Sequence, residues 1–339
     1  MSPTLDGRAA LSLLLAVASA ALISAVITWI SRPLLQRYAL ARPNARSSHR
    51  IPTPQGAGIA VIAATLLVAS ISAIGTDAAI PPALIVATVV IALVGFADDI
   101  LSLPVLLRLL LQAACVAAVV YTAPESARIV PALPLPLERG IVLLAGIWFV
   151  NLVNFMDGLD LMTVAEIVPV TAALVLLGWL GELSWPAVLV AAALCGATLG
   201  FAPFNRPVAR VFLGDVGSLP IGLLLGWCLL ELAWRGHAAA ALLLPGYYLA
   251  DATLTLFRRM ARREAFWSAH RTHFYQRATD NGFSVKRVTG ETFALNLVLA
   301  ALAVAVVHTE SILVAVVALA AGAIAIAMLL RRFSRPHRS

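Results

Sequence analysis

Residues 141–160 read IVLLAGIWFVNLVNFMDGLD. The first part of this stretch is an unbroken apolar run, and the second part places Asn151, Asn154, Asp157 and Asp160 at spacings of three. An apolar run of this kind predicts a helix that crosses a lipid bilayer. If the helix continues through the polar part, the four polar side chains align along one of its sides. The stretch therefore predicts a transmembrane helix with a polar site at one end.

The rest of the chain has the same apolar character. Of its 339 residues, 61% are hydrophobic and only 12% are charged, whereas soluble domains carry about 25% charged residues. We therefore expect an all-α, polytopic integral membrane protein, with residues 1–339 in one domain and about ten or eleven transmembrane helices. The expected spans are 9–30, 57–76, 79–96, 104–121, 140–155, 161–180, 186–204, 217–233, 238–256, 292–308 and 311–330.

The distribution of basic residues predicts the orientation in the membrane. With eleven spans, one face of the membrane receives segments 31–56, 97–103, 156–160, 205–216 and 257–291, together with the tail from residue 331. All but four of the 24 Lys and Arg residues lie in or next to these segments. The positive-inside rule then makes this face cytoplasmic, with a periplasmic N-terminus and a cytoplasmic C-terminus. A membrane explains the excess of arginine, and no nucleic-acid partner is expected.

The same arrangement places five carboxylates at cytoplasmic helix ends: Asp98, Asp99, Asp157, Asp160 and Asp215. Carboxylates at a water boundary suit a metal ion or a general base. Asp215, between two glycines, predicts a helix start whose backbone N–H groups favour phosphate and whose carboxylate holds Mg²⁺. Each motif also has a structural interpretation: interfacial anchors for the Asp98 pair, a left-handed helix end at Gly158, and a helix N-cap at Asp215.

Two basic motifs lie on the same face. Residues 42–58, RPNARSSHRIPTPQGAG, include Ser47 and His49, and residues 269–277, AHRTHFYQR, include His270, Arg271 and His273. Each motif is interpreted either as a basic segment at the membrane surface or as a site for an anionic ligand. For the two histidines, a metal site is a further interpretation. Together with the carboxylates, they predict a reaction between a phosphorylated soluble donor and a lipid, with Mg²⁺ offsetting the negative charge.

Six motifs in order, over about residues 30–290, resemble the polyprenyl-phosphate N-acetylhexosamine-1-phosphate transferases of glycosyltransferase family 4. They are RPNARSSHRIPTP, GFADD, NFMDGLD, FLGDVGS, DATLTLFRR and AHRTHFYQR. The last two are most similar to the bacterial branch that initiates O-antigen synthesis. The resemblance implies transfer of N-acetylhexosamine-1-phosphate from a UDP-sugar to undecaprenyl phosphate, with release of UMP. It also implies the bacterial inner membrane, a cytoplasmic active site, Mg²⁺ with Mn²⁺ as a substitute, a role in cell-surface polysaccharide synthesis, and a homodimer.

The resemblance also implies roles for individual residues. Asn154 and Asp215 match the positions that hold Mg²⁺. Asp98 or Asp99 would activate or orient the lipid phosphate, with Arg108 as a cationic phosphate contact. The substrate-binding positions expected are Ser47, His49, Asn151, Asp157, Asp160, Phe212, Asp251, His270, Arg271 and His273. The chain departs from the family pattern in two places: Gln55 and Ala57 replace two residues of PTPRGGG, and Leu161 replaces the last glycine of DGLDG.

Three alternatives stay open at this point. A secondary transporter would use ionisable residues near the bilayer midplane, for which Glu166 and Asp251 are the main candidates. A scaffold for glycan assembly would keep the fold without the chemistry, although Asp98 and Asp215 are both present. For a transferase, direct attack by the lipid phosphate is favoured over a covalent phospho-aspartate, because a phosphate monoester with a second pKa of about 6 needs little help from a base.

Overall fold

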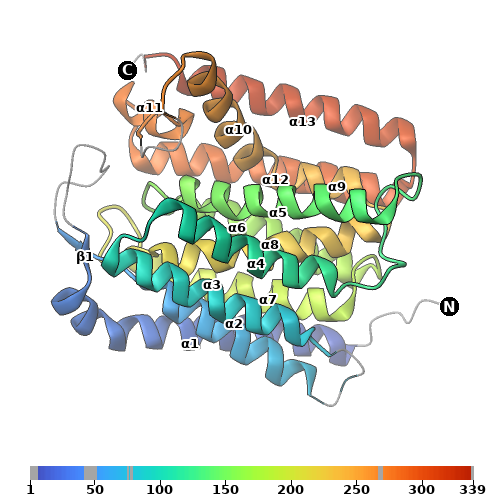
Figure 1. The fold of residues 1–339 in the computed structure, drawn as a ribbon, viewed down its shortest axis with the longest axis horizontal. Coiled ribbons are helices and arrows are strands. Elements are labelled where there is room, and N and C mark those ends of the chain that lie inside the picture. The colour runs from blue at the N-terminus through green and yellow to red at the C-terminus, as the bar shows by residue number, and fades with distance from the viewer. Residues whose placement is uncertain (1–6, 42–51, 75, 77–78, 266–269, 337–339) are drawn as a thin grey trace.

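The computed structural model describes residues 7–41, 52–74, 76, 79–265 and 270–336. They form a helical bundle in which most helices run side by side (Figure 1). Eight helices of the described residues are long and apolar enough to cross a membrane. They are α1 (Gly7–Tyr38), α3 (Pro82–Leu101), α5 (Leu135–Met156), α6 (Met162–Trp179), α7 (Trp185–Phe201), α8 (Asp215–Trp234), α12 (Val285–Thr309) and α13 (Ile312–Phe333). The all-α, polytopic class expected from the sequence is confirmed.

One of the expected spans needs a correction. Two apolar helices are shorter, α2 (Gly58–Ala73) and α4 (Val105–Tyr121). The span expected at 238–256 is two helices instead, α9 (Ala238–Leu243) and α10 (Gly246–Ala261). The break falls at Leu244 and Pro245, where the proline lacks the N–H that a continuous helix needs. The remaining elements are the 3₁₀ helix η1 (Ala202–Phe204), α11 (Phe274–Asp280) and the two-residue strands β1 (Leu40–Ala41) and β2 (Thr53–Pro54).

Local sequence explains where several helices begin. Proline occupies one of the first two positions of α3, α5 and α7, where its missing N–H costs no helical hydrogen bond. Serine side chains cap two others: Ser284 Oγ accepts the N–H of Arg287 at 3.3 Å before α12, and Ser311 Oγ accepts that of Val314 at 3.4 Å before α13. The starts of these five helices therefore follow from the residues at their N-termini.

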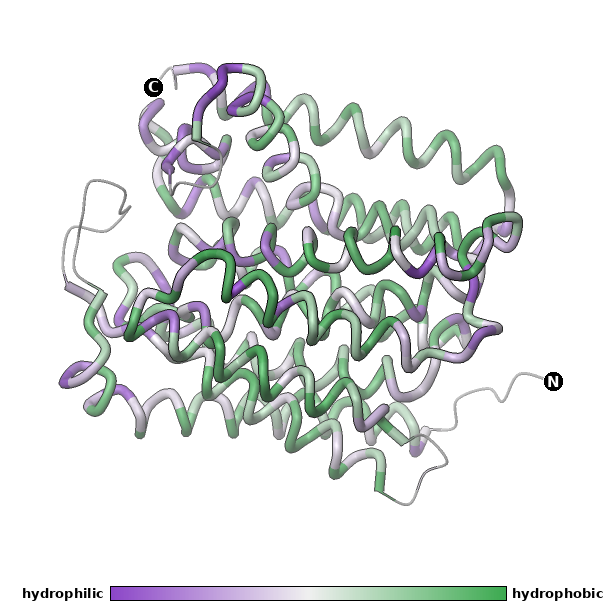
Figure 2. The backbone as a smooth tube through the Cα atoms, viewed as in Figure 1, coloured by the Kyte–Doolittle hydropathy of each residue, from purple (hydrophilic) through white to green (hydrophobic). Residues whose placement is uncertain are grey.

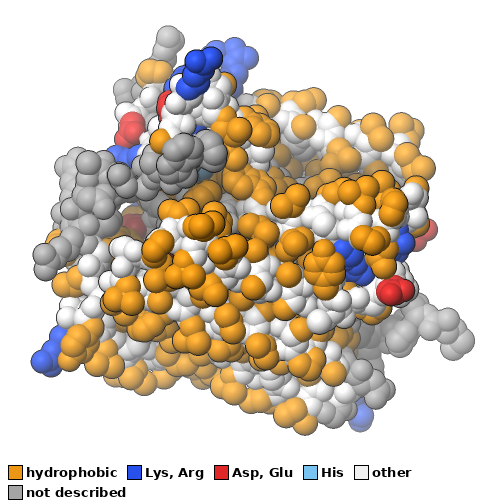
Figure 3. Space-filling model, viewed as in Figure 1, with side chains coloured by type: hydrophobic (Ala, Val, Ile, Leu, Met, Phe, Trp, Pro, Cys, Tyr) orange, Lys and Arg blue, Asp and Glu red, His pale blue; other side chains and the backbone are white. Residues whose placement is uncertain are grey.

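The helices differ in how much of their surface faces other protein. Helices α7 and α8 are apolar on all sides and lie largely buried within the bundle. Helix α13 is mostly exposed, with Ile312 at 85% and Leu313 at 72% of their full accessibility. Figure 3 shows hydrophobic side chains spread across the visible face of the bundle. Such a surface suits hydrocarbon rather than water.

Polar residues gather near the two ends of the bundle, and apolar residues fill its length (Figure 2). The first residue of α1 and the last residue of α13 lie at opposite ends of the bundle (Figure 1). At the end that carries the C-terminus, β1 and β2 pair antiparallel, with Ala41 opposite Thr53. Beyond β2, Phe212 donates its N–H to the carbonyl of Pro54 at 2.8 Å, and its own carbonyl accepts the N–H of Gly56 at 3.1 Å. The segment before α2 is thereby joined to the segment before α8.

Glycines let three helices meet backbone to backbone at this end. A Cβ added to Gly58 of α2 would lie 2.2 Å from the Cα of Gly217 in α8. A Cβ added to Gly95 of α3 would lie 2.3 Å from the carbonyl oxygen of Asp215. Any side chain at either position would force the helices apart. Glycine therefore fixes α2 and α3 against the first turn of α8.

Candidate active site

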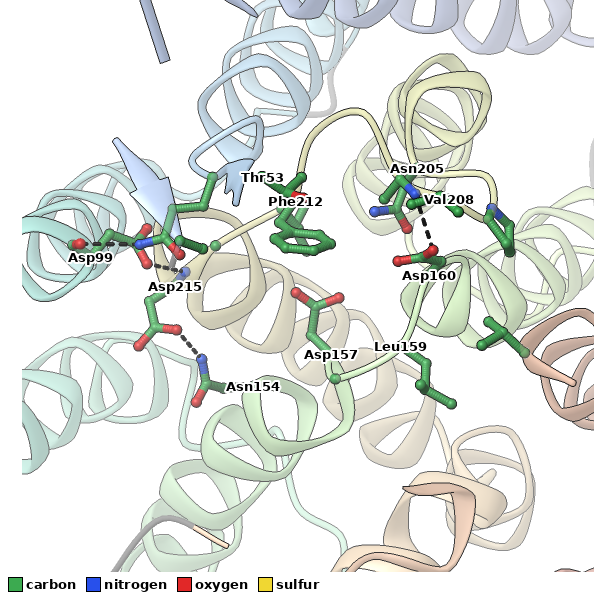
Figure 4. A pocket seen from close by; sticks show the side chains of 18 of the residues that line it. Thr53, Asp99, Asn154, Asp157, Leu159, Asp160, Asn205, Val208, Phe212 and Asp215 are labelled. Carbon is green, nitrogen blue, oxygen red and sulfur yellow. Dashed lines mark hydrogen bonds between the residues drawn. The ribbon is translucent and has the colours of Figure 1, made fainter. Parts of the chain in front are cut away.

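A cavity of about 590 Å³ opens at the end of the bundle where these helices meet. It is bordered by the ends of α3 and α5, by the connection between α5 and α6, by the segment that leads into α8, and by α11 (Figure 4). Six of the residues expected from the sequence line it: Asp99, Asn154, Asp157, Asp160, Phe212 and Asp215. Residues spread over more than a hundred positions of the chain therefore share one space.

Asn154 and Asp215 are in direct contact across the cavity wall. The side-chain nitrogen of Asn154 donates to Asp215 Oδ1 at 2.7 Å and to Ser218 Oγ at 2.9 Å. Because the nitrogen is used in this way, the carboxamide oxygen of Asn154 is the atom that remains for a ligand. The two residues expected to share a metal ion are thus adjacent, on α5 and α8.

Asp99 closes the start of α8. Its two oxygens accept the N–H groups of Asp215 at 3.0 Å and Val216 at 3.1 Å, and the next two N–H groups bond to the carbonyl of Gly214. The expectation that free N–H groups of this helix receive phosphate is therefore wrong, because a carboxylate of the chain already occupies that end. The N-cap interpretation of Asp215 is also wrong, since Gly214, with φ at 77°, holds that position.

Asp98 does not line the cavity and is held by two contacts. One oxygen accepts the N–H of Leu103 at 2.7 Å, and the other forms an ion pair with the guanidinium of Arg108. The same guanidinium nitrogen lies 3.7 Å from Asp215 Oδ2. Arg108 thus stands between Asp98 and the carboxylate of Asp215. Of the adjacent carboxylates, only Asp99 lines the cavity.

Asp157 projects from the connection between α5 and α6 into the middle of the cavity (Figure 4). The pKa of its carboxyl group is raised to about 7, mainly by burial. A hydrogen bond from the Thr163 hydroxyl lowers this pKa, and the charges of Asp99 and Asp160 raise it. Near neutral pH this carboxyl group is therefore partly protonated.

Helix α5 ends at Met156, so the four polar residues of the opening stretch do not share one helical side. Asn151 lies deeper in the bundle, where its side-chain nitrogen donates to Gln112 Oε1 at 2.7 Å and to the carbonyl of Ile147 at 2.8 Å. It does not line the cavity. Asp157 and Asp160 belong to the connection that follows the helix, and the continuing stripe is a wrong prediction.

Asn205 organises the second half of this connection. Its side-chain oxygen accepts the N–H of Leu161 at 2.7 Å, and its nitrogen donates to the carbonyl of Val211 at 3.1 Å. Asp160 Oδ2 accepts the N–H of Ala209 at 3.1 Å. Leu161 has a left-handed backbone, with φ at 64°, at the position where the family pattern has glycine. That departure therefore falls on a backbone conformation that glycine adopts without strain.

Gly158 has a different role from the left-handed helix end considered above. It is not among the described glycines with positive φ. A Cβ at this position would lie 2.2 Å from the hydroxyl of Tyr275, which donates to the carbonyl of Phe155 at 2.9 Å. The absent side chain makes room for Tyr275 and so for α11 against the α5–α6 connection.

Asp251 positions the histidine motif from inside the protein. Its carboxylate is fully buried and accepts the N–H groups of Phe274 at 3.0 Å and Tyr275 at 3.1 Å, so it caps α11 from α10. His273 Nδ1 lies 3.1 Å from the same carboxylate, and the ring of His273 stacks on that of His270 with centroids 4.9 Å apart. The structure thus assigns Asp251 a supporting position behind the histidines.

The remaining expected residues lie beside the cavity or outside the described residues. Arg271 contacts Thr279 Oγ1 and Asp280 Oδ1, each at 3.2 Å, and none of the three motif residues His270, Arg271 and His273 lines the cavity. Ser47 and His49 lie outside the described residues. Glu166, the other midplane candidate, is fully buried in α6 and accepts the side-chain N–H of Asn296 at 2.7 Å.

Three residues of the site were not singled out from the sequence: Asn205, Ser218 and Gln276. Gln276 is buried and lines the cavity, and its side-chain oxygen has no hydrogen-bond partner among the described residues. The motif that contains it, AHRTHFYQR, drew attention to its charged members. A polar amide within such a motif is the signal that would have identified it.

The donor atoms present fit a magnesium ion that shares its coordination with a substrate. No group of three or more His, Cys, Asp or Glu side chains that could hold a metal is found in the described part of the chain. Mg²⁺ is commonly bound through one or two protein oxygens, with phosphate and water completing the shell. The Asn154 amide oxygen and the Asp215 carboxylate, side by side at the cavity wall, are a donor set of this type.

Comparison with known proteins points the same way. The profile of glycosyl transferase family 4 matches residues 81–233. The chain is 28% identical over 312 residues to a decaprenyl-phosphate N-acetylglucosaminephosphotransferase of Mycobacterium leprae, covering 79% of this chain and 78% of the relative. It is 35% identical over 205 residues to a phospho-N-acetylmuramoyl-pentapeptide-transferase of Symbiobacterium thermophilum, covering 54% and 61%. The family match spans α3 to α8 and so includes Asp98, Asp99, Asn154, Asp157, Asp160 and Asp215.

Proposed function

Since residues 81–233 belong to glycosyl transferase family 4, as the ordered motifs predicted, we propose that this membrane protein transfers a sugar phosphate to a polyprenyl phosphate. The proposed reaction takes N-acetylhexosamine-1-phosphate from a UDP-sugar to undecaprenyl phosphate and gives undecaprenyl-diphosphate-sugar and UMP. The observation that carries the proposal is the cavity in which Asp99, Asn154, Asp157 and Asp215 meet at one end of an apolar bundle. The pathway proposed is synthesis of a cell-surface polysaccharide such as O-antigen.

The apolar acceptor chain has a suitable place to bind. A second cavity of about 330 Å³ lies along the bundle, between α4, α5, α8, α9 and α10. Its lining is almost entirely apolar and includes Val116, Phe149, Trp227, Leu242 and Leu249. An isoprenoid chain presents only hydrocarbon to such a wall. Pro245, at the interruption between α9 and α10, is part of this lining.

The chemistry proposed is a direct exchange of one phosphoanhydride for another. An oxygen of the lipid phosphate attacks the phosphorus that carries the sugar, and a new P–O bond forms. The bond from that phosphorus to the bridging oxygen of the nucleotide phosphate breaks, and UMP leaves with the electron pair. In phosphoryl transfer the protein contributes mainly positioning and charge stabilisation. Because the bonds formed and broken are of one kind, the reaction is expected to run in both directions.

The residues beside the cavity support direct attack. The Arg108 guanidinium lies next to the carboxylate of Asp215 and is balanced by Asp98. An incoming phosphate can take over part of that pairing, because phosphate and carboxylate bind guanidinium in the same forked geometry. Asp99 is held by two backbone N–H groups, so we propose that it orients the site rather than forming a phospho-aspartate. A lipid phosphate with a second pKa of about 6 is already largely ionised near neutral pH.

A magnesium ion is part of the proposal, with Mn²⁺ as a substitute. Asn154 and Asp215 would hold it, and when bound it would offset negative charge on the donor diphosphate. Asp157 in the middle of the cavity and Asp160 on the side away from Asn154 (Figure 4) can contact the nucleoside or sugar. The arginine distribution supports a cavity that faces the cytoplasm, the compartment that supplies soluble UDP-sugars.

The test is UMP release by purified protein given undecaprenyl phosphate, Mg²⁺ and a panel of UDP-N-acetylhexosamines. We expect turnover with at least one donor, loss of at least roughly a hundredfold in Asp215→Asn, and loss on chelation with recovery on adding Mg²⁺ or Mn²⁺. The matched control is Glu125→Gln, which removes an exposed carboxylate between α4 and α5. Folded protein that turns over no donor would sink the proposal, and uptake of UDP-sugar into proteoliposomes without UMP release would favour the transporter.

A further inference from the structure

We propose that the groove between α12 and α13 binds the headgroup of an anionic membrane phospholipid. The groove has a volume of about 1340 Å³ and lies at the end of the bundle that carries the active-site cavity. It is separate from that cavity and from the apolar groove proposed for the acceptor chain, and it shares no lining residue with either.

The charged part of the groove carries a positive excess. Four arginines line it, Arg287, Arg331, Arg332 and Arg335, against one carboxylate, Glu291. Both oxygens of Glu291 are already engaged: Arg332 bonds them at 2.7 and 3.0 Å, and Arg287 bonds one of them at 2.9 Å. Within the described residues, no ion pair involves Arg331 or Arg335. Two guanidinium groups at the rim are therefore the ones positioned for an external anion.

Two of the four arginines, Arg287 and Arg332, are held in place by neighbouring side chains. The guanidinium of Arg332 lies 5.4 Å from the ring centroid of Phe283, and that of Arg287 lies 5.7 Å from the same centroid. Phe283 packs edge-on against the fully buried Phe333, with centroids 5.7 Å apart. Cation–π contacts and the shared carboxylate fix two of the four guanidinium groups. Where an anion also contacts this fixed pair, less side-chain entropy is lost on binding.

The apolar part of the groove identifies the kind of anion. Next to the arginines the lining becomes Leu295, Ala325, Met328 and Leu329. It continues onto the exposed face of α13, where Met328 is 68% and Ile324 is 61% accessible. A soluble phosphate has nothing to place against this surface, whereas a phospholipid has acyl chains. A second copy related by a two-fold axis would bring arginine rims together, which like charges oppose.

Occupancy of the groove would also brace the active site. Asn281, one residue beyond α11, donates from its side chain to the carbonyl of Phe333 at 2.7 Å. Gln276 on α11 and Val285 at the start of α12 both line the active-site cavity. Phe283 and Arg287, which line the groove, belong to the same stretch of chain. A lipid that holds α12 against α13 therefore holds this stretch as well.

The test is lipid binding, which needs no turnover and so is independent of the proposed function. Detergent-purified protein is titrated with phosphatidylglycerol or phosphatidylcholine of equal chain length, and retained lipid is measured by native mass spectrometry. We expect preference for phosphatidylglycerol, and an affinity about thirtyfold lower in Arg331→Gln/Arg335→Gln, because each basic side chain near an anionic headgroup contributes roughly fivefold. Phosphatidylglycerol should also raise the Tm of the wild type but not of this variant.

The control is Arg8→Gln/Arg37→Gln, which removes the same charge from exposed positions on α1. It should keep both the preference and the Tm increase. An equal loss of phosphatidylglycerol affinity in the control, or equal binding of the two lipids by the wild type, would contradict the proposed site. Displacement of phosphatidylglycerol by millimolar inorganic phosphate would overturn the lipid as the ligand. A change from dimer to monomer in the groove variant, independent of lipid, would assign the groove to a second copy instead.

Discussion

Asp99, near the end of α3, accepts the backbone N–H of Asp215, the first residue of α8, at 3.0 Å. Its other oxygen accepts the next N–H of the helix, that of Val216. Sequence reasoning treats Asp99 and Asp215 as two separate functional carboxylates. The structure joins them: one carboxylate holds the helix end that presents the other to the cavity.

Replacement of Asp99 should therefore affect stability as well as activity. Asp99→Ala leaves two buried N–H groups without an acceptor and should lower the free energy of unfolding by roughly 1–2 kcal/mol. Asp99→Asn keeps one acceptor oxygen, so its free energy of unfolding should fall by less than half of that amount. Thermal unfolding in detergent measures both. If the alanine and asparagine variants unfold at the same temperature as the wild type, the carboxylate does not hold α8.

Arg108 is expected to serve the lipid acceptor. Arg108→Gln should raise the KM for polyprenyl phosphate by roughly 10- to 100-fold, the value of one charge-assisted hydrogen-bonded contact, with a smaller change in the KM for the donor. Arg108→Lys keeps the charge but not the forked geometry, so its KM for polyprenyl phosphate should lie between those of the wild type and Arg108→Gln. Steady-state kinetics with each substrate varied in turn makes the distinction, and Arg37→Gln is the control. An equal rise in both KM values contradicts an acceptor-specific role.

Asp157 should make stability depend on pH. Burial raises the pKa of its carboxyl group from 3.8 to about 7 in the folded protein. Between these values the folded state binds more protons than the unfolded state, so this contribution to stability is lost as the pH rises. Asp157→Asn removes the titration while keeping an acceptor for Thr163. The Tm gain of the variant over wild type should grow from about pH 4 to about pH 7 and then level off.

A constant difference in Tm across that range would show that Asp157 does not titrate there. Glu125→Gln, an exposed carboxylate between α4 and α5, serves as the control for general effects of charge removal. The measurement uses detergent-solubilised protein without substrate, so that a bound diphosphate does not change the environment of the carboxyl group.

Leu161 carries local backbone strain that a glycine would relieve. A left-handed conformation costs a residue with a Cβ about 1–2 kcal/mol, whereas glycine loses about 0.4–1 kcal/mol through the larger freedom of the unfolded chain. Leu161→Gly should therefore be more stable than Leu161→Ala, which loses the same side chain beyond Cβ but keeps the strain. Unfolding of the two variants in parallel checks this. An alanine variant as stable as the glycine variant would mean that φ is not strained.

Much of the fold could be predicted because a bilayer imposes a simple length rule. Long apolar runs became helices close to the expected positions, for example α8 for the span at 217–233. The failure at 238–256 has a physical cause: average hydropathy over a window hides a single Pro245, which interrupts the helix. Residues 246–261 then form an amphipathic helix whose Asp251 faces inward to cap α11.

The site was predicted in part for a related reason. Residue type and position at a helix end identified Asp99, Asn154, Asp157 and Asp215 as members of one cavity. Which atoms each side chain binds depends on contacts between distant segments, such as Asn205 with Leu161 and Val211. No pattern in one sequence fixes those partners. Asn151 illustrates the limit: its spacing matched Asn154, yet the end of α5 at Met156 leaves it buried beside Gln112.

The glycine contacts of α2 and α3 with α8 have a consequence for mutagenesis. Where Gly58 meets Gly217 and Gly95 meets the carbonyl of Asp215, the support of the cavity is main chain, with no side chain to remove. An alanine scan therefore cannot weaken this support by truncation. It can only wedge the helices apart, so inactive variants at these positions would report on the spacing of the scaffold and give no information on chemistry.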